Sequence, residues 1–149
     1  MDRSMFIAVW RTILCLWLIS VLLVISFPWS KFDGTPHWEN IQWIPFTHLS
    51  FHQPVIVETA ANILGFIPIG YLTVRSLSPS TRHRFFLASL MGFCSSTGIE
   101  VYQLFCHDRV PETADVLMNV AGTVVGAWLA FAIDQILTFC RLQLCRFSS

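Results

Sequence analysis

Charged residues are scarce in this sequence, and their scarcity excludes an ordinary soluble domain. Only 12% of the 149 residues are Asp, Glu, Lys or Arg, against about 25% in a typical soluble domain. Apolar residues make up 54% of the chain, and the mean hydropathy is +0.61. The formal net charge of zero offers no electrostatic basis for binding a nucleic acid. The composition indicates an integral membrane protein, and the length indicates one domain, residues 1–149.

A disulfide framework and a signal-peptide cleavage site are also missing. The cysteine count is odd and most of the cysteines lie in apolar runs, where they pack as small hydrophobes. They are Cys15, Cys94, Cys106, Cys140 and Cys145. The residues from Ser26 to Trp29, after the first apolar run, are bulky where a signal peptidase needs small ones. We therefore expect the first apolar run to be an uncleaved helix.

Long apolar runs are abundant. A helix needs about 20 mostly apolar residues to cross the hydrocarbon core of a bilayer, and four segments meet this requirement. They span residues 6–27, 55–74, 85–105 and 115–140. Residues 30–54 form the longest stretch without this character and are rich in Trp and Pro. The sequence predicts an all-α integral membrane protein, a compact bundle of four transmembrane helices with one long loop.

The basic residues predict how the bundle is oriented. Basic residues favour the cytoplasmic side of a membrane, and seven of the nine lie near the two termini or between the second and third helices. They are Arg3, Arg11, Arg75, Arg82, Arg84, Arg141 and Arg146. Only Lys31 and Arg109 fall in the other two loops. We therefore expect both termini to be cytoplasmic and loops 30–54 and 106–114 to face outward.

Several ionisable and amide side chains lie inside the predicted helices, where they are costly and usually serve a function. They occur as pairs spaced three or four residues apart, so each pair shares one helix face. The pairs are Glu58 with Asn62, Glu100 with Gln103, and Asp115 with Asn119, and Arg109 lies in the adjacent short loop. Each pair lies near the outer end of its helix. We expect these seven residues to form one polar layer in the outer leaflet that binds a ligand.

The chemistry of this layer stays open at the level of sequence. Three carboxylates face one cation, so either a carboxyl is protonated or a ligand cation joins the site. No embedded His or Lys stands near a hydroxyl as a base, and Glu100 is the one candidate for catalysis. The outer-loop histidines lack the spacing of a metal motif, so we predict neither a metal nor a cofactor. Those histidines are His37, His48, His52 and His107.

Small residues and a proline predict where the helices pack. Gly residues four apart allow close approach of helices in membranes, and a Pro inside a helix removes one backbone hydrogen bond. The predicted packing positions are Gly65, Pro68, Gly70, Gly122 and Gly126. Near the cytoplasmic end we expect Asp134 to pair with Arg141.

Three of these features together resemble the VanZ-like family of membrane proteins. The run from Asn62 to Gly70 resembles the first signature of the family, and the segment from Ser96 to Gln103 resembles the second. Residues Arg109, Asp115, Asn119, Gly122 and Gly126 resemble the third at the expected spacing. Glu112 departs from the family, where Asp is commoner. The resemblance covers about half of the chain.

The resemblance implies a small helical bundle in a bacterial cytoplasmic membrane. The founding member of the family is associated with resistance to the glycopeptide antibiotic teicoplanin. The resemblance therefore brings glycopeptide susceptibility into consideration without assigning resistance to this chain. The biochemical activity of the family is not established, so no catalytic residue is carried over.

Three functions remain open from the sequence. The first is binding of a lipid or cell-envelope precursor headgroup in the outer leaflet. The second is an enzyme that uses Glu100 as acid or base on a lipid-linked substrate. The third is a scaffold without a ligand, in which the face bearing Gly122 and Gly126 docks another helix. A homodimer or another membrane protein would then be the partner.

Overall fold

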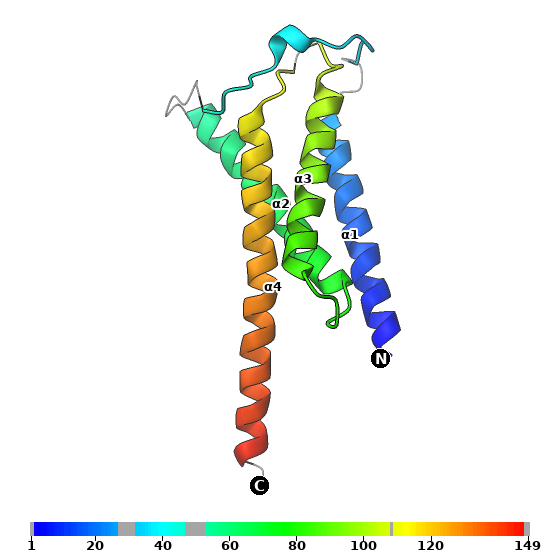
Figure 1. The fold of residues 1–149 in the computed structure, drawn as a ribbon, viewed down its shortest axis with the longest axis vertical. Helices are drawn as coiled ribbons and strands as arrows, with labels where there is room; N and C mark the ends of the chain where they lie inside the picture. Colours follow the sequence, from blue (N-terminus) through cyan, green and yellow to red (C-terminus); the bar gives the residue numbers. More distant parts are fainter. Residues whose placement is uncertain (1, 27–31, 47–52, 108, 148–149) are drawn as a thin grey trace.

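The computed structural model describes residues 2–26, 32–46, 53–107 and 109–147. Four long helices make up most of this part: α1 (Arg3–Ser26), α2 (Gln53–Ser76), α3 (Arg84–Gln103) and α4 (Thr113–Phe147). Each is long and apolar enough to cross a membrane. Figure 1 shows that the N- and C-terminal ends lie on one side of the bundle and the longest loop on the other. The predicted four-helix membrane fold is confirmed.

The ends of α3 and α4 differ from the predicted ones. Helix α3 ends at Gln103, two residues early, because Phe105 and Cys106 turn back to the carbonyl groups of Tyr102 and Gln103. Helix α4 continues to Phe147, seven residues beyond the prediction. Its 35 residues give a length of about 52 Å at 1.5 Å per residue. The last turns of α4 project past the other helices (Figure 1).

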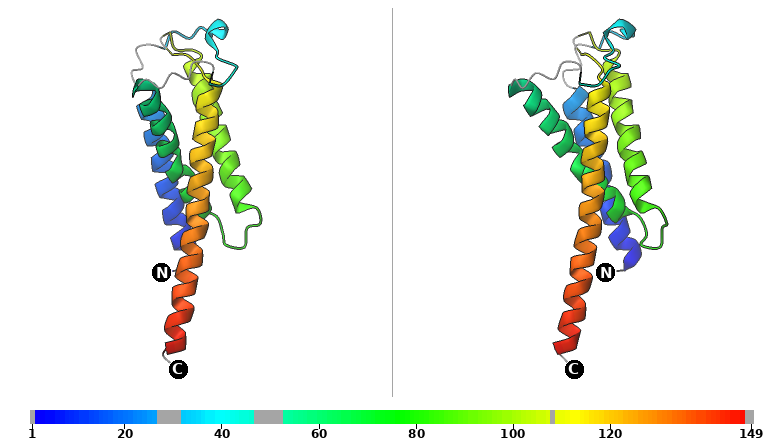
Figure 2. Two further views of the ribbon diagram at one scale, coloured as in Figure 1. Left: turned by 90° about the vertical axis from the view of Figure 1, so that its left-hand side faces the viewer. Right: turned by 60° about the vertical axis from the view of Figure 1, so that its left-hand side comes forward.

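Glycines hold α2 against α4 at backbone contact. Figure 2 shows α2 crossing α4 at an angle. A Cβ at Gly126 would collide with the carbonyl oxygen of Ile67, and one at Gly122 with that of Ile63. A Cβ at Gly70 would collide with the carbonyl oxygen of Thr123. The face of α4 that bears Gly122 and Gly126 is therefore covered by α2 of the same chain and is not open to a second protein.

Gly65 and Pro68, also on α2, were predicted as packing positions, but Gly65 does not contact α4 as Gly70 does. A Cβ at Gly65 would meet no atom within 4 Å, so close approach of another helix does not require a glycine there. Its carbonyl oxygen accepts a hydrogen bond of 3.0 Å from Trp17 Nε1 of α1. Pro68 lies inside α2, which continues as one helix on both sides of it.

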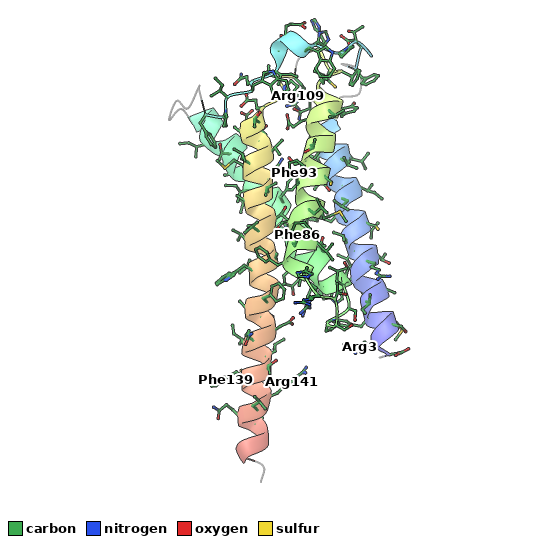
Figure 3. The ribbon with its side chains drawn as sticks, viewed as in Figure 1. Arg3, Phe86, Phe93, Arg109, Phe139 and Arg141 are labelled. Atoms are coloured by element: carbon green, nitrogen blue, oxygen red, sulfur yellow. The ribbon has the colours of Figure 1, made fainter. Side chains whose placement is uncertain are left out.

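The core is small, and most large apolar side chains face outward. One buried cluster joins Val74, Ala88, Ala127 and Ala130, while a second joins Phe66, Ile69 and Ile99, against which α1 packs. The exposed fractions of Phe86, Phe93 and Phe139 are 64%, 51% and 62% (Figure 3). Such a surface suits hydrocarbon rather than water, because exposed apolar patches of this extent are rare on soluble proteins.

An ion pair joins α2 and α4 toward the end that carries the termini. Arg75 Nη1 bonds Asp134 Oδ1, so Asp134 does not take the predicted partner, Arg141. The guanidinium of Arg75 also lies over the rings of Trp10 and Tyr71, at 5.6 and 5.7 Å from their centroids. The pairing with Arg75 was missed because it depends on the crossing of α2 and α4, whereas Arg141 is near only in sequence.

The long loop is fastened across the ends of α3 and α4. Its described part, residues 32–46, contains the short helix η2 (Trp38–Asn40) and crosses the top of the bundle in Figure 1. Isolated β-bridges join Phe32 to Cys106 and Gln42 to Glu112. This end of the molecule is called the loop-covered end below. Two of the histidines considered from sequence, His48 and His52, lie outside the described residues.

Candidate functional site

A pocket of about 400 Å³ lies at the loop-covered end of the bundle. All seven residues of the predicted polar layer line it: Glu58, Asn62, Glu100, Gln103, Arg109, Asp115 and Asn119. Val24, Ala61, Ile99, Val110 and Glu112 complete the lining. The fold thus brings together side chains from three helices and one loop, as the common depth suggested. Their role in binding stays a prediction.

The glycine contact between α2 and α4 positions one wall of the pocket. Asn62 precedes Ile63, whose carbonyl oxygen lies against Gly122, and Asn119 lies one turn before Gly122 on α4. Because the two backbones touch at this level, both amides are held beside the pocket. Asp115, one turn earlier on α4, interacts with the side chain of Asn62.

Glu100 anchors the loop between α3 and α4. It is only 9% exposed, and its Oε2 accepts a hydrogen bond of 2.8 Å from the backbone N–H of Glu112. Glu112 directly precedes α4, where unpaired N–H groups and the helix dipole favour a negative partner. The carboxylate of Glu100 therefore ties α3 to the start of α4 and to the loop that carries Arg109.

One side-chain atom of Asn119, a residue that lines the pocket, has no hydrogen-bond partner among the described residues. The residue is 2% exposed, and its Nδ2 donates a hydrogen bond of 2.9 Å to Ser96 Oγ. Its Oδ1 is buried and has no hydrogen-bond partner among the described residues. A buried acceptor without a partner costs about 1–3 kcal/mol. A ligand that brings a hydrogen-bond donor to this atom would remove that cost.

The charges around the pocket are uneven. Its lining holds four carboxylates, those of Glu58, Glu100, Glu112 and Asp115, and one cation, Arg109. Arg109 lies close enough to act electrostatically on Glu100 and Asp115. It is nevertheless exposed and, within the described part of the chain, forms no ion pair shorter than 4.0 Å. The pocket can therefore receive an anionic group at Arg109 and a cationic or hydroxyl group among the carboxylates.

Sequence reasoning missed Glu112 as a residue of this site. Glu112 lies three residues after Arg109 and three before Asp115, and this spacing of charges was the available signal. The β-bridge to Gln42 and the hydrogen bond to Glu100 place it at the pocket.

A second polar group, Asp33 with His37 and His107, was also missed. His37 Nε2 lies 2.8 Å from Asp33 Oδ2, and His107 Nδ1 lies 4.0 Å from the same oxygen. The N–H of Thr35 and then His37 lower the pKa of Asp33 to about 2. The hydrogen bond with Asp33 raises the pKa of His37. Asp33 and His37 are four residues apart, but the contribution of His107 required the fold.

Comparison with known families agrees with the resemblance seen in the sequence. The family model described as VanZ/LLP1 matches residues 10–136, which is most of the chain. No curated protein sequence and no solved structure matches the chain. With four helices able to cross a membrane and this match, the chain is a multi-pass membrane protein that belongs to the VanZ/LLP1 family.

Proposed function

We propose that this protein binds the polar headgroup of a membrane lipid or of a lipid-linked cell-envelope precursor in the pocket at its loop-covered end. In this proposal the pocket faces the outer leaflet of a bacterial cytoplasmic membrane, with both termini in the cytoplasm. The observation that supports it is the gathering of one cation, four carboxylates and three amides in one pocket of a membrane-spanning bundle.

The chemistry of the lining favours a headgroup with both an anionic and an amine or hydroxyl part. The planar guanidinium of Arg109 suits a phosphate or carboxylate, which it can bind through two parallel hydrogen bonds. Glu58, Glu100 and Asp115 suit an amine or hydroxyl group. Asn119 Oδ1, buried and without a partner in the described residues, accepts a further donor from the ligand. Asn62 and Gln103 orient the headgroup.

Size and depth support the same ligand class. A volume of about 400 Å³ lies within the range of about 300–1,000 Å³ for small-molecule sites. Glu100 lies three residues before the end of α3, which is about 4.5 Å along the helix axis. Asp115 is the third residue of α4. The charged groups therefore lie near the helix ends, where headgroups meet the hydrocarbon core.

Native mass spectrometry in a gentle detergent tests the proposal. The comparison uses the wild type, Arg109→Ala and the matched control Arg141→Ala, which removes an exposed cation at the opposite end of the bundle (Figure 3). We expect a lipid or precursor to co-purify with the wild type and with Arg141→Ala and to be lost from Arg109→Ala. Equal retention by both variants, or no bound species in any sample, would overturn the proposal.

The same variants address the cellular effect that the family resemblance brings into consideration. Cells that express the wild type or Arg141→Ala should show the same glycopeptide susceptibility, and Arg109→Ala should shift it toward that of cells without the protein. If Arg109→Ala matches the wild type in cells while losing its lipid, susceptibility is not a consequence of binding at this pocket.

The burial of Glu100 favours one second candidate, an enzyme that acts on a lipid-linked substrate. A carboxyl group that is 9% exposed beside a pocket is placed to transfer a proton. Turnover of lipid-linked substrate by purified protein, abolished in Glu100→Gln while the lipid still binds, would establish this function. Binding without turnover in the wild type would exclude it for the substrates tested.

A further inference from the structure

Three metal-ligating side chains meet above the end of α3, outside the pocket. They are Asp33 and His37 in the long loop and His107 in the loop between α3 and α4, and their nearest ligand atoms all lie within 4.8 Å of one another. We propose that these three residues form a binding site for a divalent transition metal, with zinc the best match to two imidazoles and one carboxylate. This proposal does not depend on headgroup binding at the pocket.

The distances suit a small tetrahedral ion. Zinc binds imidazole nitrogen and carboxylate oxygen at about 2.0–2.2 Å, so two ligand atoms of a tetrahedral site lie about 3.3 Å apart. The separation between His37 Nε2 and Asp33 Oδ2 is 2.8 Å, and that between His107 Nδ1 and Asp33 Oδ2 is 4.0 Å. These two values lie on either side of the required distance, and all three ligand atoms lie within 4.8 Å of one another, so rotations of the side chains would bring them to tetrahedral spacing.

The backbone holds the ligand positions together independently of the side chains. The N–H of Asp33 donates to the carbonyl oxygen of Phe105 at 3.1 Å, and the N–H of His37 donates to that of Leu104 at 2.9 Å. A β-bridge also joins Phe32 to Cys106, next to His107. Because these contacts fix both segments, metal binding does not have to order the loop, and more of the binding energy appears as affinity.

A second set of contacts orients two of the three ligands. Asp33 Oδ1 accepts hydrogen bonds from the N–H and the hydroxyl of Thr35, at 2.9 and 3.0 Å, which leaves Oδ2 toward the two histidines. The other ring nitrogen of His37, Nδ1, lies 3.7 Å from Glu39 Oε1. Histidines that bind metals commonly direct their second nitrogen to a carboxylate. If Asp33 and His37 formed only an ion pair with each other, the positions of Glu39 beside His37 and of His107 beside Asp33 would have no explanation.

A metal bound here would have two consequences for the molecule. Three protein ligands leave a fourth position for water or for a group of a bound molecule. The metal would also fasten residues 32–46 to the loop that carries Arg109, two residues after His107. The expected sites of anion binding and metal binding are thus on the same short loop.

Zinc titration of the full chain tests the proposal. The protein, purified in detergent without a polyhistidine tag and freed of metal by a chelator, is titrated with zinc against a chromogenic competitor. The variants are His37→Asn and His107→Asn, with His83→Asn as the matched control. His83 is exposed at the other end of α3 and has a φ of +66°, which Asn tolerates. Circular dichroism checks that each variant keeps its helices.

We expect one zinc per chain in the wild type and in His83→Asn, with an affinity at least tenfold weaker in both His37→Asn and His107→Asn. Glu39→Gln should weaken zinc binding by about tenfold through the orientation of His37. The three-residue site would be overturned if the wild type binds no stoichiometric zinc. It would also be overturned if either His37→Asn or His107→Asn, still helical, binds zinc as the wild type does.

Discussion

The carboxylate of Glu100 accepts a hydrogen bond from the backbone N–H of Glu112 at 2.8 Å, so a side chain of α3 holds the residue that precedes α4. This contact gives a membrane-embedded acidic group a structural task beside any role in binding. It also ties the loop that carries Arg109 to α3 beside the pocket. The two tasks can be separated by substitution.

Glu100→Ala should destabilise the protein more than Glu100→Gln. Alanine leaves the N–H of Glu112 without its acceptor, at a cost of about 1–3 kcal/mol, whereas the glutamine carbonyl oxygen can still accept that bond. Unfolding of each variant by denaturing detergent, followed by circular dichroism, measures the difference. Equal stability of the two variants would show that the contact with Glu112 does not support the fold.

Gly126→Ala should weaken the bundle strongly. The added methyl group would collide with the carbonyl oxygen of Ile67, and overpacking of this kind costs about 1–3 kcal/mol. Gly98→Ala is the matched control, because a Cβ there meets no atom within 4 Å. We expect that control to be neutral or stabilising by up to about 1 kcal/mol, from helix propensity alone. Similar unfolding midpoints for both variants would contradict the close contact of α2 with α4.

Arg75→Ala should destabilise the end of the bundle near the termini more than Asp134→Asn. The Arg75→Ala substitution removes the ion pair with Asp134 and the contacts with the rings of Trp10 and Tyr71. We expect this to lower the free energy of unfolding by about 1–2 kcal/mol in total. Asp134→Asn should cost less than about 1 kcal/mol, because the Asp134 side chain is 39% exposed and the asparagine oxygen can still accept a hydrogen bond from Arg75. Thermal unfolding in detergent measures both, with Arg141→Ala expected to change little. A larger loss in Asp134→Asn would contradict this account of Arg75.

Zinc affinity should fall as the pH is lowered. Asp33, with a pKa of about 2, is ionised throughout the accessible range. The hydrogen bond with Asp33 raises the pKa of His37 above its ordinary value. In the metal-free protein, the pair therefore contributes fully to the folding stability below about pH 6.5. That contribution is lost as the pH rises through the raised pKa. Zinc must displace that proton. Affinity should therefore drop toward tenfold per pH unit for each proton displaced, and pH-independent binding between pH 5 and 8 would contradict binding at His37.

The spanning helices were predictable because hydropathy and length alone decide which segments enter a membrane. The polar layer was predictable in outline, because Glu100 and Asn119 each lie near one end of an apolar run. Placing such polar side chains in the middle of the run would cost more free energy. The remaining features depend on the path of the loops and on how the helices cross. Neither the partner of Asp134 nor the meeting of His107 with Asp33 follows from local spacing. Helix α4 continues to Phe147, beyond the predicted end at residue 140, because helix formation does not require the continuous apolar run from which the span was predicted.

The backbone contact between α2 and α4 also determines which parts of the pocket can move. Where carbonyl oxygens of α2 lie against Gly122 and Gly126, the two helices cannot slide or separate without losing that contact. The contact therefore fixes the point at which the two helices cross. If the pocket widens for the proposed headgroup, we expect the change on the side of α3 and of the loop that is bonded to Glu100.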